Sequence, residues 1–277
     1  MLGIKFDSAR IILLLFLVTI IGIIIYKNSN SLMRFMVSQE INLNTASYNK
    51  METDHFLIKF LPVDQLFIPM IAECAEAAYH SVTDELGGEP GKKTTIVVYP
   101  NSQSLAKSFG WNKNEKAMGV YWAGSIRLLS PREWLTGGNN KAQFMAEGPL
   151  HHELAHLMVD EITGGNYNRW WTEGIAQYVE KKLTGFQFAD PFAQGKEKQY
   201  FKLDDLAANF DKYDQQIAYW ESLKAIEYIS HHFGEEFLFS IMHELGNGCD
   251  MVQAIEGSLG IDYYQFEQDF YSELGTN

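Results

Sequence analysis

Two histidines four residues apart flank a glutamate in the segment from His152 to His156. Residues at this spacing lie on one face of an α-helix, so both imidazoles can converge on a single metal ion. Zinc in a hydrolytic site usually takes three protein ligands and leaves the fourth tetrahedral position to water. The segment therefore predicts two zinc ligands, His152 and His156, with Glu153 beside the water as general base.

The third ligand must come from elsewhere in the chain, and Glu173 is the best candidate. It follows the second histidine by seventeen residues and stands at the expected start of another helix, after the turn-forming segment 164–166. Asp160 and Glu161 lie too close on the first helix to swing round to the ion, and Glu180 lies about two turns beyond Glu173. We therefore expect one zinc ion held by two histidines and one glutamate.

The residues around the motif distinguish among the other interpretations of it. A metzincin needs glycine and histidine at the third and sixth positions after the second histidine, but Val159 and Ile162 stand there. An accidental match or an occupied but non-catalytic site stays open. A buried active-site helix is favoured by an apolar stripe at helical spacing, formed by Leu150, Leu154, Leu157 and Met158.

The segment from His152 to His156, together with that from Trp171 to Tyr178, resembles the gluzincin branch of zinc metallopeptidases and most of all the bacterial peptidase-MA-like domains. The resemblance covers about residues 52–269, although only these two segments are specific. It implies a zincin-like α+β fold, with a small N-terminal sheet lobe over the active-site helix and a helical lobe after it. It also implies peptide or protein substrates, zinc bound by His152, His156 and Glu173, and Glu153 as the catalytic base.

The resemblance extends to the surroundings of the ion. Thermolysin-like relatives place an aspartate four residues after the ligand glutamate, where this chain has Gln177; an amide still accepts a hydrogen bond from imidazole, with less charge. Relatives also use a tyrosine or histidine of the C-terminal helical region as oxyanion donor. Tyr219 is the first candidate for that donor, ahead of His231 and His232. In related peptidases an edge strand of the first lobe pairs with extended substrate, and the resemblance implies that role here for the strand around 119–122 or its hairpin partner.

Strands precede helices in the predicted order of elements, which indicates an α+β fold. We expect strands at residues 55–61, 94–99, 118–122 and 125–130, the last two joined as a hairpin about Ala123 and Gly124. Helices are predicted at residues 64–86, 102–109, 215–232, 235–246, 251–259 and 263–274, in addition to those of the zinc motif.

An apolar run without charged residues at 11–26 predicts a transmembrane segment. It extends about 24 Å, short of a hydrocarbon core of about 30 Å, so Arg10 and Lys27 must snorkel at its ends. A signal anchor is favoured over a cleaved signal peptide, whose one weak cleavage site is at 29–31.

The positive residues before this run place residues 1–10 in the cytoplasm. A polar stalk at 27–50 would then lead to a catalytic domain at 51–277 outside the cytoplasm. The predicted location is the cell membrane, crossed once.

The charge composition excludes one class of binding partner. With 22 basic and 35 acidic residues, the net charge of −13 argues against binding to nucleic acid. Cys74 and Cys249 are too few for a disulfide scaffold; Cys74 is expected as a buried free thiol, and a single bridge between the two stays open.

The zinc motif and the apolar N-terminal run together leave two candidate functions. The chain is either a membrane-anchored extracytoplasmic zinc peptidase, or a catalytically weak or inactive zinc-binding module of the same fold that binds peptide or a partner protein.

Overall fold

A computed structural model describes residues 15–20, 22, 29–112, 115–138, 140–193 and 199–276 of the 277-residue chain. The chain divides into two compact units, Met1–Ala46 and Ser47–Asn277. In the first, α2 (Ser29–Asn44) lies in the segment where the sequence predicted a polar stalk. No helix within the described ranges is long and apolar enough to cross a membrane. Most of the predicted span at 11–26 lies outside those ranges.

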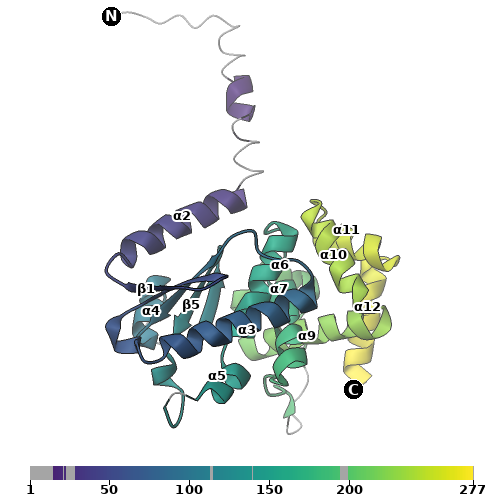
Figure 1. The fold of residues 1–277 in the computed structure, drawn as a ribbon. Coiled ribbons are helices and arrows are strands. Elements are labelled where there is room, and N and C mark those ends of the chain that lie inside the picture. The colour runs from purple at the N-terminus through teal and green to yellow at the C-terminus, as the bar shows by residue number, and fades with distance from the viewer. Residues whose placement is uncertain are drawn as a thin grey trace, which may run out of the picture. The chain divides into compact units, whose positions relative to one another are not determined.

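The second unit starts with a five-stranded mixed sheet, in the order β1-β2-β3-β5-β4 (Figure 1). Its strands are β1 (Asn49–Glu52), β2 (Phe56–Phe60), β3 (Thr94–Tyr99), β4 (Gly119–Trp122) and β5 (Ser125–Leu129). The three inner strands run parallel, and the outer strands β1 and β4 are antiparallel to their neighbours. Strand β1 was not predicted, because its largely exposed residues carry no alternating apolar pattern.

A two-residue turn at Ala123 and Gly124 joins β4 to β5, as the sequence predicted. Both residues have positive φ, +44° and +84°, as in the type I′ turns whose twist matches that of the flanking strands. Trp122 pairs with Ser125 across the turn. The hairpin leaves β4 as an edge strand of the sheet.

Helices form the rest of the second unit. They are α3 (Ile68–Leu86), α4 (Ser102–Ser108), α5 (Lys141–Glu147), α6 (Leu150–Thr163), α7 (Arg169–Thr184), α8 (Leu203–Asn209), α9 (Gln215–His232), α10 (Glu236–Gly246), α11 (Met251–Leu259) and α12 (Tyr263–Thr276). Helix α3 starts four residues later than predicted, since a 3-10 turn precedes it and Pro69, which has no N–H, occupies its first turn. The predicted α+β class is confirmed: a small sheet precedes a largely helical remainder.

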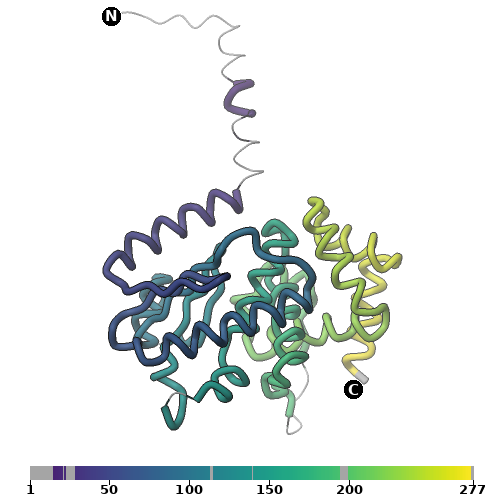
Figure 2. The backbone as a smooth tube through the Cα atoms, viewed as in Figure 1, coloured from purple at the N-terminus to yellow at the C-terminus, as the bar shows by residue number. Residues whose placement is uncertain are grey.

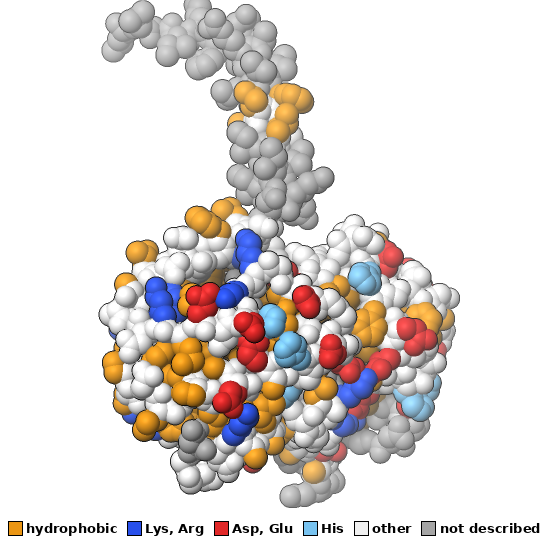
Figure 3. All heavy atoms as spheres, viewed as in Figure 1, with side chains coloured by type: hydrophobic (Ala, Val, Ile, Leu, Met, Phe, Trp, Pro, Cys, Tyr) orange, Lys and Arg blue, Asp and Glu red, His pale blue; other side chains and the backbone are white. Residues whose placement is uncertain are grey.

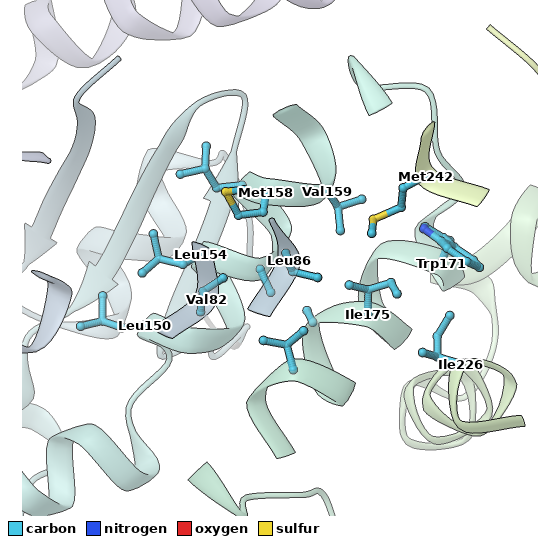
Figure 4. Packing of buried hydrophobic residues seen from close by; sticks show 14 of the residues in the cluster. Val82, Leu86, Leu150, Leu154, Met158, Val159, Trp171, Ile175, Ile226 and Met242 are labelled. Carbon is cyan, nitrogen blue, oxygen red and sulfur yellow. The ribbon is translucent and has the colours of Figure 1, made fainter. Parts of the chain in front are cut away.

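Helix α6 packs against α3, α7, α10 and β4, and so lies in the middle of this unit. The four residues of the predicted apolar stripe, from Leu150 to Met158, are all buried. Figure 4 shows their neighbours in the core, among them Val82 and Leu86 of α3, Trp171 and Ile175 of α7, Ile226 of α9 and Met242 of α10. Because this stripe faces the core, the residues between its members point to other surfaces of α6.

The backbone continues from α6 through α7 and α9 to α10, α11 and α12, which lie on the far side of α6 from the sheet (Figure 2). Cys74 of α3 is buried and free, as predicted, and Cys249 is also free and partly exposed. No bridge joins the two cysteines in the structure.

Candidate metal centre

The three predicted ligands lie together at the contact between α6 and α7. Nε2 of His152 and Nε2 of His156 are 3.1 Å apart. Oε2 of Glu173 lies 3.5 Å from the first nitrogen and 3.4 Å from the second. Helix α6 contributes both imidazoles through their four-residue spacing, and α7 brings the carboxylate from its first turns.

These atoms fit a tetrahedral cation. At zinc–ligand bond lengths of about 2.0–2.2 Å, neighbouring ligand atoms lie about 3.4 Å apart. The Glu173 Oε2 atom is buried and accepts no hydrogen bond, although a buried carboxylate oxygen is costly without a partner. Two nitrogens and one oxygen, each facing the others, form the donor set that zinc prefers.

Each imidazole is oriented by a contact on its other nitrogen. Nδ1 of His152 lies 3.2 Å from Oε2 of Glu180, and Nδ1 of His156 lies 2.6 Å from Oγ1 of Thr172. Such contacts fix the ring plane and leave Nε2 free to bind a metal. Both Nε2 atoms therefore direct a lone pair toward the same point.

The expectation for Gln177 was wrong. Its Nε2 donates to the backbone oxygens of Glu173, at 3.0 Å, and Tyr219, at 2.8 Å, so its amide joins α7 to α9 instead of contacting an imidazole. Glu180, three residues further along α7, takes the position beside His152. The imidazole partner is consequently a full carboxylate, and the predicted loss of charge does not occur.

The electrostatics of the cluster favour a positive charge at its centre. Burial lowers the pKa of His152, but the carboxylates of Glu173 and Glu180 outweigh this effect and hold that pKa well above its usual value. Burial raises the pKa of Glu173, but the two histidines outweigh it and hold that pKa well below the usual range. The cluster thus stabilises a cation between its carboxylates, whether proton or metal.

Glu153 lies beside the cluster, under the edge of the sheet. Its Oε2 accepts a hydrogen bond of 2.5 Å from the backbone N–H of Tyr121 in β4. Burial raises the pKa of this carboxyl, against the effect of His152 and His156. Strand β4 approaches α6 closely at Gly119, where a Cβ atom would come within 2.9 Å of Cγ of Glu153. The absence of a side chain at Gly119 lets the strand reach the glutamate.

The second oxygen of Glu173 is held from α7 and α9. Oε1 accepts a hydrogen bond of 3.1 Å from the hydroxyl of Tyr219 and lies 3.4 Å from Nε of Arg169. Tyr219 is therefore near the cluster, as predicted, but its hydroxyl contacts the carboxylate. His231 and His232 are three turns further along α9, about 18 Å at 1.5 Å per residue, and are not part of the cluster.

Four contacts of the cluster were not foreseen: those of Thr172, Glu180, Arg169 and the N–H of Tyr121. The sequence did carry a signal for Glu180, which follows Glu173 by seven residues and so lies on the same helical face two turns later. Arg169 likewise precedes Glu173 by four residues, at the spacing of neighbours on a helix. The N–H of Tyr121 leaves no trace in the sequence.

Comparison with known proteins gives one family match. The model of the Peptidase MA superfamily matches residues 74–275, more than half of the chain. Similar solved structures include a mutant of a two-domain M1 zinc metallopeptidase bound to L-arginine, at 14% identity and a TM-score of 0.40, with 81% of this chain and 50% of that one covered. Another is the M1 zinc metallopeptidase from Deinococcus radiodurans, at 11% identity and a TM-score of 0.40, with 80% and 49% covered. The chain spans about half the length of these enzymes, and no curated protein matches it.

Proposed function

The chain belongs to the Peptidase MA superfamily, and on this premise we propose that it is a membrane-anchored zinc peptidase acting outside the cytoplasm. The observation that carries the proposal is the convergence of His152, His156 and Glu173 within 3.1–3.5 Å of one another. Glu153, a buried carboxylate that is not one of the three, lies beside them.

The residues have distinct roles in this proposal. His152, His156 and Glu173 would hold one zinc ion, which when bound supplies a Lewis acid that polarises a water molecule and the scissile carbonyl. Glu153 takes the proton of the attacking water and passes it to the leaving amine. The N–H of Tyr121, on Oε2 of Glu153, keeps this carboxylate in one orientation.

The substrate would lie along strand β4 as an extended segment. This strand ends the sheet, and the N–H of Tyr121 points away from β5 toward Glu153. An edge strand can add a peptide as a further strand through main-chain hydrogen bonds. Such binding selects extended or unfolded segments with little regard to side chains.

The membrane part of the proposal is supported by the sequence. Residues 11–26 are apolar and uncharged, which suits a signal anchor that leaves residues 1–10 in the cytoplasm and the domain from residue 51 onward outside. Protease added to intact cells should then digest the domain, and a domain protected until the cells are lysed would contradict this placement.

Peptide hydrolysis by the full chain tests the enzymatic proposal. We expect cleavage of casein or of a broad peptide library, loss of cleavage on chelation, and recovery when Zn²⁺ is restored. The His156→Ala variant should lose both the tightly held zinc and cleavage. Stoichiometric zinc without cleavage of any peptide would support the non-catalytic module instead, and a chain that holds no zinc would contradict both functions.

A further inference from the structure

A second group of metal-binding side chains lies apart from the candidate metal centre. One potential ligand atom of each of His55, Glu76 and His80 lies within 4.8 Å of the other two. His55 immediately precedes β2, and the other two residues belong to α3. Glu76 and His80 are four residues apart, so they lie on one face of α3, as His152 and His156 do on α6.

The backbone of His55 is fixed on both sides. Its N–H donates to Oε1 of Glu76 at 3.0 Å, and its carbonyl oxygen accepts from the N–H of Thr94 at 2.9 Å. The turn that contains His55 is closed by the bond from the N–H of Thr53 to the oxygen of Phe56, at 2.9 Å. The turn and the neighbouring strand β3 therefore hold His55 against α3.

The rings are also held in place. The His55 ring stacks on Tyr79 with centroids 3.8 Å apart and planes 14° from parallel, and it meets the His80 ring edge-on at 5.4 Å. Nδ1 of His55 lies 2.5 Å from Oε2 of Glu76. Tyr79 is buried and belongs to the hydrophobic core, so the His55 ring packs on a core side chain. A hydrogen bond between His55 and Glu76 explains two of the three residues, but it gives no role to His80.

We propose that His55, Glu76 and His80 form a second site for a divalent transition-metal ion such as Zn²⁺, Cu²⁺ or Ni²⁺. A site with two imidazoles and one carboxylate binds these ions in preference to Ca²⁺ or Mg²⁺, which favour ligand sets made of oxygen atoms. His80 is exposed, and the side chains of His55 and Glu76 are 29% and 23% exposed, so water can complete the coordination. Histidines and acidic side chains lie next to one another on the face where α3 is in front (Figure 3).

A bound ion would connect the turn before β2 to the middle of α3. Its ligands come from two elements that are far apart in the sequence, so binding favours the folded state. The site needs none of the residues of the proposed catalytic centre. Loss of either ion should therefore leave the other in place.

Metal content of the full chain at saturating Zn²⁺ tests the proposal. We expect two ions per chain in the wild type and one each in His80→Ala and Glu76→Gln, with the remaining ion removed in the double variant His80→Ala/His156→Ala. His243→Ala, which removes an exposed histidine of α10, should retain two. Thermal unfolding in chelator should be the same for His80→Ala and the wild type, which excludes misfolding as the cause.

Copper gives an independent readout. The electron paramagnetic resonance spectrum of Cu²⁺ bound to the His156→Ala variant should show hyperfine couplings to two imidazole nitrogens. One of these couplings should be lost in the double variant His80→Ala/His156→Ala. The proposal would be overturned if the wild type bound only the one ion that His156→Ala removes. It would also be overturned by a second ion that persists in both His80→Ala and Glu76→Gln.

Discussion

Oε2 of Glu180 lies 3.2 Å from Nδ1 of His152, on the side of the ring opposite Glu173. This carboxylate fixes the ring and increases the basicity of the nitrogen that faces the other ligands. We expect Glu180→Gln to weaken zinc binding by about 10–100-fold. Competition with a chromogenic chelator measures this change, and Glu147→Gln, an exposed site on α5, should leave the affinity unchanged. Equal affinities for Glu180→Gln and the wild type would show that the contact does not tune the metal.

Tyr219 should act on the metal through Glu173, because its hydroxyl donates to Oε1 of that carboxylate. Tyr219→Phe removes this donor and leaves Arg169, whose side chain is 42% exposed, on the same oxygen. We expect a fall in zinc affinity of roughly tenfold, the lower end of the range for partners of metal ligands. Zinc titration together with kcat at saturating zinc distinguishes a tyrosine that holds the ligand Glu173 from one that donates to the oxyanion. Unchanged zinc affinity with a reduced kcat would instead assign Tyr219 as the oxyanion donor suggested by the sequence.

Gly174, next to Glu173, sets the approach of α7 to α9. A Cβ atom at this position would lie 2.5 Å from the backbone oxygen of Ser222 and 2.6 Å from Cγ1 of Ile226. Although alanine favours helix, Gly174→Ala should destabilise the fold by about 1–3 kcal/mol through overpacking. Gly257→Ala, in α11 with nothing near the added atom, should stabilise it by about 0.5–1 kcal/mol. Urea denaturation of the two variants measures both changes, and the same sign for both would contradict this account of the α7–α9 contact.

Glu221 should make stability depend on pH. It is fully buried, its Oε2 accepts from the N–H of Phe201 at 2.9 Å, and its Oε1 accepts from the hydroxyl of Tyr271. Burial raises the pKa of this carboxyl to about 7. Between pH of about 4.3 and 7 the unfolded chain has released this proton and the folded chain has kept it, so the free energy of unfolding falls as pH rises.

The variant Glu221→Gln isolates this effect. Its amide N–H can donate to the Tyr271 oxygen, whose own proton then goes to the backbone oxygen of Phe201, and its amide oxygen can accept from the N–H of Phe201. The amide thus replaces the protonated acid without titrating. The stability of the variant relative to the wild type should therefore rise by roughly 2–4 kcal/mol between pH 4.5 and about pH 8 and stay constant above that. Denaturation midpoints across this pH range measure the difference. A difference that does not change with pH would show that folding does not raise the pKa of Glu221.

The elements that the sequence predicted best are those with local signals at their ends. Helix α9 begins after Asp214, whose side chain accepts from the N–H groups of Gln216 and Ile217, and α11 begins with a capping box on Asp250. Helix α8 has no such cap, since the side chain of Lys202 makes no capping hydrogen bond. It depends on burial against the rest of the domain, as β1 depends on backbone pairing with β2, and neither contact is visible in a local pattern.

At the metal centre, too, local spacing can be read from the sequence but contacts between helices cannot. Helical spacing alone brings His152 and His156 together, because both are on one helix. The orientation of α7 decides which of its polar residues faces them. Gln177 and Glu180 both lie on the side of α7 that carries Glu173, yet the crossing of the helices turns Gln177 toward α9 and Glu180 toward His152. A crossing angle is set by packing over the whole interface, so the choice between these two residues could not be made from the sequence.

In the proposed mechanism Glu153 performs proton transfer beside a metal ion that it does not bind. The most direct test compares Glu153→Gln with Glu161→Gln, which changes an exposed glutamate of the same helix, for zinc content and peptide hydrolysis by the full chain. We expect both variants to retain the zinc that His156→Ala removes, and Glu153→Gln alone to lose hydrolysis by about 10²–10⁴-fold, the usual contribution of a general base. Hydrolysis by Glu153→Gln at the rate of Glu161→Gln, with zinc in place, would contradict this role of Glu153.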